Sequence, residues 1–260
     1  MFARKHVGVR AAAGLVVLAL AAFAHDSNAC SCAGPEGQLL GPDRVDDAPT
    51  NTKVRLELPS HAINARTVLA VRGGAEVAVK SRSMSVGSVD VVELTPSSAL
   101  APATQYVVSI VDDSRHPPVR VLGTFKTASA EDKTAPKIDS IGRVYTTRDG
   151  TNVRTSCSVG TPWITVESIK ASDPGRPNAQ LFYGVWVGDA SGKIDDTKPP
   201  SAILRPYQDR LTIGRSSVCD PHDVTLPKTP FAWIGIAALD EAGNASPVRK
   251  MKVDLKAGTP

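Results

Sequence analysis

The four cysteines are the residues of this 260-residue chain with the clearest potential for chemistry. Two stand together as Cys30-Ser31-Cys32, whereas Cys157 and Cys219 lie far apart in the second half. An even number of cysteines favours disulfide bonds in a chain that leaves the cytoplasm. Four cysteines allow three pairings, and we expect Cys157 to pair with Cys219 because both lie in one predicted domain. The pairing of Cys30 and Cys32 stays open.

A second group of residues has the composition of metal ligands. Cys219-Asp220-Pro221-His222-Asp223 contains a Cys-x-x-His spacing, which is half of a zinc site. The sequence offers no matching second half, since Cys157 has no ligand-type neighbour, so a surface loop held by a disulfide is the better interpretation. The segment 189–196 places Asp189, Asp195 and Asp196 around a glycine, but lacks the regular spacing and distal Glu of a calcium loop. We expect a turn there, and no metal in either segment.

Catalytic patterns are missing from the sequence. No Gly-x-Ser-x-Gly motif is present, and His61, His116 and His222 each stand in a polar, loop-like context. Gly73-Gly74 is followed by neither Gly-Lys-Ser/Thr nor a helical pattern, so it is not a phosphate-binding loop. We therefore expect a protein that is not an enzyme, with no catalytic residue and no cofactor.

Residues 1–29 are typical of a secretory signal peptide. Arg4, Lys5 and Arg10 precede an apolar run over 11–24, and Ser27-Asn28-Ala29 provides small residues before Cys30. Cleavage after Ala29 would lower the net charge from +4 to +2. We expect an extracytoplasmic protein that is secreted, periplasmic or attached to the cell envelope. A lipid on Cys30 is an open alternative, and it would be the protein's one link to a membrane.

A mature chain that begins with Cys30-Ser31-Cys32 resembles the start of the tissue inhibitors of metalloproteinases. In that family the first cysteine chelates a protease zinc through its amine and carbonyl. The resemblance implies inhibition of a metalloprotease, but it covers three residues, and that family has an OB barrel and more cysteines than this chain. It remains one alternative function.

The elements that must position these residues are β-strands. After a tether over 30–45, residues 46–127 alternate short apolar runs with turn clusters, and Val54, Leu56 and Leu58 alternate with charged residues. Helical periodicity is nearly absent. Further strands are expected at the following segments: 67–71, 77–79, 89–94, 106–111 and 121–125. Five or six strands at this spacing predict a β-sandwich.

Two motifs support this interpretation of residues 46–127. Leu94-Thr95-Pro96 precedes Leu100-Ala101-Pro102-Ala103-Thr104-Gln105-Tyr106, and Gly123-Thr124-Phe125-Lys126-Thr127 ends the segment. This arrangement resembles the bacterial Ig-like domains of surface-layer and cell-envelope proteins. The resemblance implies that Tyr106 forms a tyrosine corner, with its ring in the core and its hydroxyl bonded to backbone upstream. It says little about function.

A linker over 128–137 leads to a second predicted β-domain over 138–256. Strands are expected at the following segments: 138–144, 163–169, 181–187, 203–204, 211–213, 231–239 and 248–255. The strongest, 231–239, runs into Asp240-Glu241-Ala242-Gly243-Asn244, and together with Asp132-Lys133-Thr134-Ala135-Pro136 it resembles fibronectin type III-like and Ig-like modules. The fold class is therefore all-β, with two tandem Ig-like sandwiches after a signal peptide.

Composition limits the function further. Hydrophobic residues make up 42% and charged residues 22%, which excludes a disordered chain and a multi-span membrane protein. The small net charge argues against nucleic acid. We expect a cell-surface interaction or structural protein with a protein or glycan partner. A carbohydrate-binding or enzyme-accessory module is an alternative, and it would need exposed aromatics, whereas we expect Trp186 and Trp233 in the core.

Overall fold

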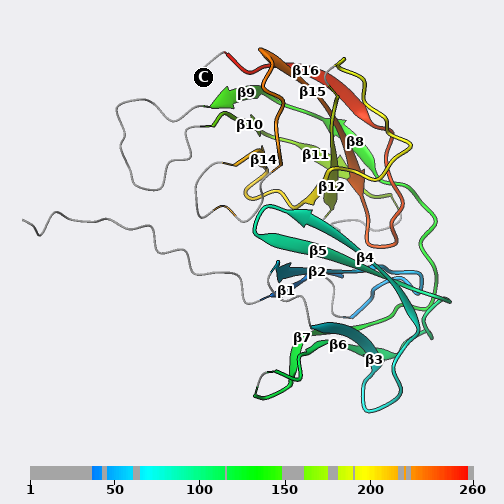
Figure 1. Ribbon diagram of the computed structural model, residues 1–260. Helices are drawn as coiled ribbons and strands as arrows, with labels where there is room; N and C mark the ends of the chain where they lie inside the picture. Colours follow the sequence, from blue (N-terminus) through cyan, green and yellow to red (C-terminus); the bar gives the residue numbers. More distant parts are fainter. Residues whose placement is uncertain are drawn as a thin grey trace, which may run out of the picture.

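The computed structural model describes residues 37–42, 46–60, 65–114, 116–147, 161–174, 181–189, 191–215, 220 and 224–256. Within these ranges the secondary structure consists of strands β1 to β16, and no helix occurs (Figure 1). It follows that this part of the chain contains no helix with the length and hydropathy to cross a bilayer. The predicted signal peptide, all four cysteines, His61 and His222 lie outside the described residues.

The first seven strands form one sandwich of two antiparallel sheets. One sheet has the order β1-β2-β5-β4 and the other has the order β3-β6-β7. In chain order this is A-B-E-D against C-F-G, the strand arrangement of an Ig constant-type domain. The strands are β1 (Gln38–Gly41), β2 (Val54–Pro59), β3 (Arg66–Val71), β4 (Val79–Val86), β5 (Val89–Pro96), β6 (Gln105–Val111) and β7 (Val119–Lys126).

The alternation of β2 explains the core of this sandwich. Val54, Leu56 and Leu58 are buried with the side chains of the facing sheet, as a period-2 strand predicts. The intervening Arg55 and Glu57 are also buried, at 1% and 3% exposure. The outer face of this sheet is therefore covered as well.

Tyr106 has the geometry of a tyrosine corner. Its side chain is 2% exposed and its ring stacks on Phe125, with the ring centroids 5.4 Å apart. The backbone N–H of Ala101 donates a hydrogen bond of 2.9 Å to the Tyr106 hydroxyl. This bond fixes the loop before β6 onto the core.

Replacement of Tyr106 by phenylalanine is expected to lower the free energy of unfolding by about 1 to 2 kcal/mol, because the Ala101 N–H loses its acceptor in a half-buried site. Thermal or urea unfolding measures the loss. Tyr207→Phe is the matched control, since Tyr207 is 76% exposed and should tolerate the change. Equal stabilities of the two variants would contradict this role of the hydroxyl.

The remaining strands form a second sandwich. A four-stranded sheet has the order β13-β12-β15-β16, and the opposite side consists of β14-β10-β9 and the short pair β11-β8. The strands are β8 (Lys137–Ser140), β9 (Val144–Thr147), β10 (Trp163–Val166), β11 (Lys170–Ser172), β12 (Phe182–Val187), β13 (Ala202–Leu204), β14 (Leu211–Ile213), β15 (Phe231–Leu239) and β16 (Arg249–Asp254).

The strand β15 lies at the centre of the second core. Ile234, Ile236 and Ala238 point into it and are fully buried. On the opposite face, Trp233 and Ala237 join Trp186 in a small separate cluster with Ile194. Trp186 is therefore buried in a core cluster, as expected, whereas Trp233 is only half-buried at its edge, which differs from the expectation.

The structure adds strands that the sequence pattern does not reveal. β1 lies inside the segment predicted as a tether, where it pairs with β2. β4 continues from Val79 through polar, exposed residues to Val86, since pairing with β5 needs no apolar side chains on an edge strand. The predicted strand 138–144 is interrupted after Ser140, and a further strand, β9, begins at Val144.

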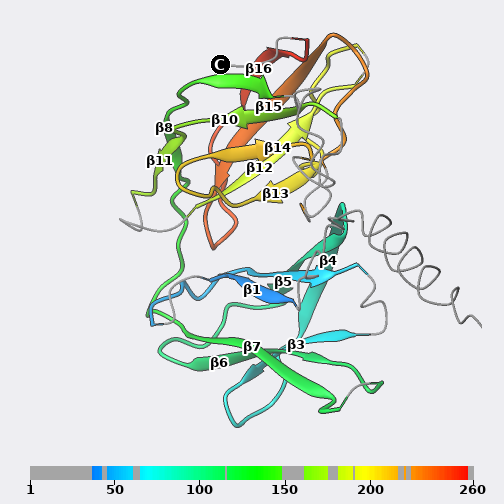
Figure 2. The ribbon, with the colours of Figure 1, turned by 90° about the vertical axis from the view of Figure 1, so that its left-hand side faces the viewer.

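The two sandwiches pack against each other through the sheet β1-β2-β5-β4. In both views this sheet faces the second sandwich, and β3-β6-β7 lies on the far side (Figures 1 and 2). Leu40, Val86 and Val91 from the outer face of this sheet belong to the same buried cluster as the core of the second sandwich. The hydrophobic core of the second domain thus continues into the domain junction.

Candidate functional site at the domain junction

A fully buried arginine occupies the polar part of the junction. Arg55, on β2, donates from Nε to Glu93 Oε2 at 3.1 Å and from Nη1 to the Asp240 carbonyl at 2.9 Å. Its guanidinium also lies over the ring of Phe182, 5.0 Å from the centroid. Asp240 and Phe182 belong to the second sandwich, so one side chain joins both domains.

Glu93 balances this charge from the neighbouring strand β5. Its side chain is 7% exposed and also lies 3.6 Å from both Lys53 Nζ and Arg82 Nη2. Burial alone would raise the pKa of the Glu93 carboxyl, but the charges of Arg55, Lys53 and Arg82 outweigh burial and hold that pKa below its ordinary value. Glu93 is therefore ionised at neutral pH and paired with Arg55.

Backbone contacts and close packing complete the junction. The Lys53 N–H donates to the Glu241 carbonyl at 2.7 Å, across the two domains. Gly41 faces the ring of Phe182, and a Cβ at residue 41 would lie 3.1 Å from two ring carbons. Glycine at the end of β1 thus allows the two backbones to approach.

The linker is held by amide side chains from both domains. Asn51 of the first sandwich donates to the Asp132 carbonyl at 2.8 Å and accepts from the Asp132 N–H at 2.9 Å. Asn244 of the second sandwich donates to the carbonyls of Asp132 and Thr134, at 3.1 and 3.3 Å. Asp132 is therefore fixed relative to both domains.

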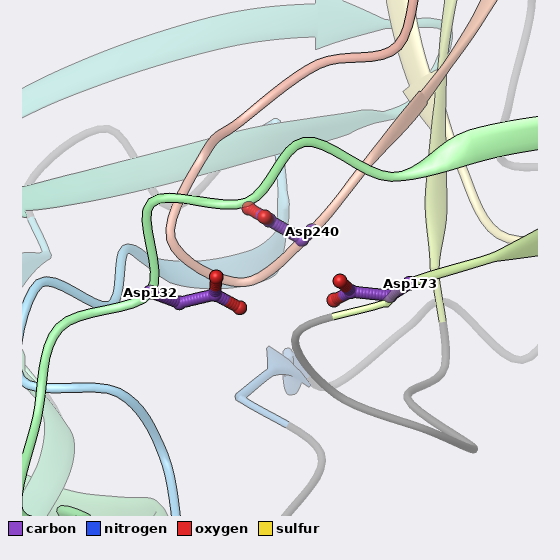
Figure 3. Close-up of side chains that lie close together, drawn as sticks. All are labelled: Asp132, Asp173 and Asp240. Atoms are coloured by element: carbon purple, nitrogen blue, oxygen red, sulfur yellow. The ribbon is translucent and has the colours of Figure 1, made fainter.

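Three buried carboxylates meet beside this linker (Figure 3). Asp132 belongs to the linker, Asp173 follows β11, and Asp240 follows β15. One carboxylate oxygen of each lies within 4.8 Å of the other two, and the residues are 8%, 5% and 1% exposed. The side chains of Asp132 and Asp173 point toward one another.

The surroundings of these carboxylates differ. Both oxygens of Asp240 accept hydrogen bonds of 2.7 Å from Asn244. Burial raises the pKa of Asp240, and so does the nearby charge of Asp132, whereas the Asn244 bonds lower it and offset only part of the rise. Oδ1 of Asp132 accepts from the Thr134 N–H, but its buried Oδ2 has no hydrogen-bond partner among the described residues.

This arrangement can bind a cation that prefers oxygen. Three carboxylates supply hard, anionic ligands, and the described members of the cluster include neither His nor Cys. No sequence pattern predicts this site, because its three members are far apart in the chain. The available signal was weak: Asp132 and Asp240 occur in the two segments that resemble modular domains, and nothing in the pattern around Asp173 marked it.

Asp189 organises a turn at the start of the acidic segment at 189–196. Oδ1 of Asp189 accepts from Ser191 N, Ser191 Oγ and Lys193 N, at 2.9, 2.6 and 3.1 Å. The side-chain hydrogen bond from Ser191 is the main reason that the pKa of Asp189 is lowered. Gly192 adopts a φ of 83°, as a tight turn requires. The expected turn is present, and Asp189 serves as its cap.

The other candidate residues lie apart from the junction or outside the described residues. His116 is exposed in the β6–β7 hairpin and precedes a cis proline. Cys30, Cys32, Cys157 and Cys219 lie outside the described residues, so the disulfide, the lipid and the inhibitor motif stay predictions.

None of the three tryptophans is exposed as a sugar platform requires. Trp186 is 9% exposed and donates from Nε1 to the Lys198 carbonyl at 2.8 Å, while Trp163 and Trp233 are half-buried. A flat row of exposed tryptophans is thus not available for stacking on a glycan.

Comparison with known proteins found solved structures of low similarity. A solved structure of the fibronectin(III)-like modules of CbhA from Clostridium thermocellum is 12% identical, with a TM-score of 0.27, and the match covers 86% of this chain and 97% of that one. The tandem Ig repeats of Dlar are also 12% identical, with a TM-score of 0.25 and coverage of 85% and 99%. No protein-family model and no curated protein matches the chain. By its strand order the first domain is an Ig-like β-sandwich, and the second is also a sandwich of antiparallel sheets.

Proposed function

We propose that this chain is an exported, non-enzymatic structural or interaction protein whose two sandwiches are held in one fixed orientation. The main observation that supports this proposal is the buried junction between the two domains. Domain interfaces within a chain are usually polar and permit relative motion. Here, Leu40, Val86 and Val91 extend the core of the second domain, and Arg55 is 1% exposed. Separation of the domains would expose apolar surface and break a buried ion pair.

A fixed orientation suits a module that presents surfaces to a partner at a cell surface. Sandwich domains place their loops and edge strands at defined positions, and exposed edges accept a further strand from another protein. β7 is the edge of its sheet, and it exposes Val119 and Val121 at 50% and 58%. This edge supports a protein partner in preference to a glycan.

The export part of the proposal rests on the predicted signal peptide over 1–29. Intact-mass analysis of the protein from fractionated bacterial cells is expected to find it outside the cytoplasm, without this segment. Disulfide formation should also lower the measured mass by the two hydrogens that are lost. Peptide mapping under non-reducing conditions should then find Cys157 linked to Cys219. A full-length, fully reduced protein in the cytoplasmic fraction would contradict export and the disulfide. A diacylglyceryl group on Cys30 would instead assign the membrane link.

A further inference from the structure

The carboxylates of Asp132, Asp173 and Asp240 converge at the domain junction, where one oxygen of each lies within 4.8 Å of the other two. Three ionised carboxylates within 4.8 Å repel one another, and burial removes the water that would screen them. A cation bound among the three carboxylates would relieve this repulsion. The side chains come from three separate segments, so the fold itself assembles the cluster (Figure 3).

Asp132 supplies independent evidence for a ligand. The residue is more than nine-tenths buried, and its Oδ2 has no hydrogen-bond partner among the described residues. A buried oxygen of this kind costs free energy unless something binds it. Its carboxylate points toward Asp173, into the space that the cluster shares.

We propose that Asp132, Asp173 and Asp240 bind a single calcium ion between the linker and the second sandwich. Calcium accepts six to eight oxygen ligands at about 2.4 Å, in flexible geometry. Two oxygens on opposite sides of such an ion are therefore about 4.8 Å apart. The three carboxylate oxygens all lie within 4.8 Å of one another, so they can contact one such ion together. Zinc favours His and Cys, and magnesium demands a smaller, near-octahedral shell.

The ion would act on the orientation of the domains. Asp132 is bonded to Asn51 of the first sandwich in both directions, and its carbonyl accepts from Asn244 of the second. Binding at the Asp132 carboxylate therefore fixes the linker at the point where it contacts both domains. The inference deepens the proposed function, because calcium would make the junction more rigid.

Calcium titration of the mature protein tests the proposal. Isothermal calorimetry with CaCl₂ is expected to show one site per chain, with a Kd of about 10⁻⁴ M, as in extracellular calcium-binding modules. Calcium at about 100 times this Kd should raise the unfolding midpoint by about 5 °C or more relative to EGTA. Equimolar MgCl₂ should raise it less.

Asp132→Asn is the most informative substitution, because asparagine keeps an oxygen that can accept from the Thr134 N–H and removes one negative charge. In EGTA the variant should be at least as stable as the wild type, since repulsion is relieved. In calcium the wild type should be the more stable, and the variant should bind calcium about tenfold more weakly or worse. Asp189→Asn, in the exposed turn, is the matched control and should bind as the wild type does.

The results separate this inference from the proposed function. Absence of calcium heat and an unchanged unfolding midpoint would overturn the calcium site, while the Arg55 junction and the fixed orientation would stand. Equal losses in Asp132→Asn and Asp189→Asn would also overturn it, because they would indicate non-specific binding to acidic surface. Calcium binding by domains that tumble independently would instead contradict the fixed orientation.

Discussion

Replacement of Arg55 by alanine is expected to lower the free energy of unfolding by about 3 to 5 kcal/mol. The substitution removes the only fully buried partner of Glu93 among the described residues, and it removes the donor to the Asp240 carbonyl. Glu93 is 7% exposed and keeps, within the described part of the chain, only its longer contacts with Lys53 and Arg82. A buried charge without its partner is among the most destabilising changes known. Urea unfolding at neutral pH measures the loss.

Two controls define the origin of this effect. Arg66→Ala removes the Arg66–Glu76 pair, which has good geometry but is exposed, so it should leave stability unchanged.

Lowering the pH supplies the second control. The Glu93 pKa is lowered in the folded protein, so this ion pair stabilises above the ordinary Glu pKa of about 4.3 and is lost as the pH falls through the folded pKa. Arg55→Ala should raise the Glu93 pKa and shift acid unfolding to higher pH. Equal stability of Arg55→Ala and Arg66→Ala would show that the junction does not depend on this pair.

The second large effect is expected at Phe182. Phe182→Ala should lower the free energy of unfolding by about 3 to 5 kcal/mol, because the side chain is 1% exposed and its loss leaves a cavity. The same change removes the ring beneath Arg55 and beside Gly41, so it should also loosen the junction. Thermal unfolding measures the first effect, and amide exchange at Lys53 measures the second, since the Lys53 N–H is bonded across the domains.

Phe231→Ala is the matched control for Phe182, with the same chemical change in the same sheet. Phe231 is 37% exposed at the start of β15, so its replacement should cost less than about 1 kcal/mol and should leave Lys53 exchange unchanged. If Phe182→Ala destabilised the protein without faster exchange at Lys53, the ring would belong to the second core alone.

Most of the longer, apolar strands of both sandwiches follow from local patterns. Val54, Leu56 and Leu58 alternate as a half-buried strand does, and β15 is marked by its run of apolar residues. Period-2 alternation, however, predicts a solvent-facing side for Arg55. The second domain covers that side, and no property of β2 alone reveals the contact. In the sequence, the charge of Arg55 thus predicts a solvent-exposed side chain. In the fold, the same side chain is buried between the two domains.

The carboxylate cluster was not predictable for a related reason. Asp132 and Asp173 are separated by four strands, β8 to β11, and Asp240 follows after a further four. Each stands in a polar, turn-like context that ordinary surface residues share. Only the pairing of β11 with β8, and the return of β15 to the same end of the sandwich, bring them together. Spacing rules for metal ligands apply to ligands on one loop or helix, and this cluster has none of that regularity.

Residual dipolar couplings of the mature, isotopically labelled protein test the fixed orientation most directly. Couplings from β1 to β7 and from β8 to β16 should fit one alignment tensor, with the domains arranged as in Figure 2. Such a fit requires the two sandwiches to tumble as one body. Two different tensors, or a marked reduction of the couplings in one domain, would show independent motion and contradict the account.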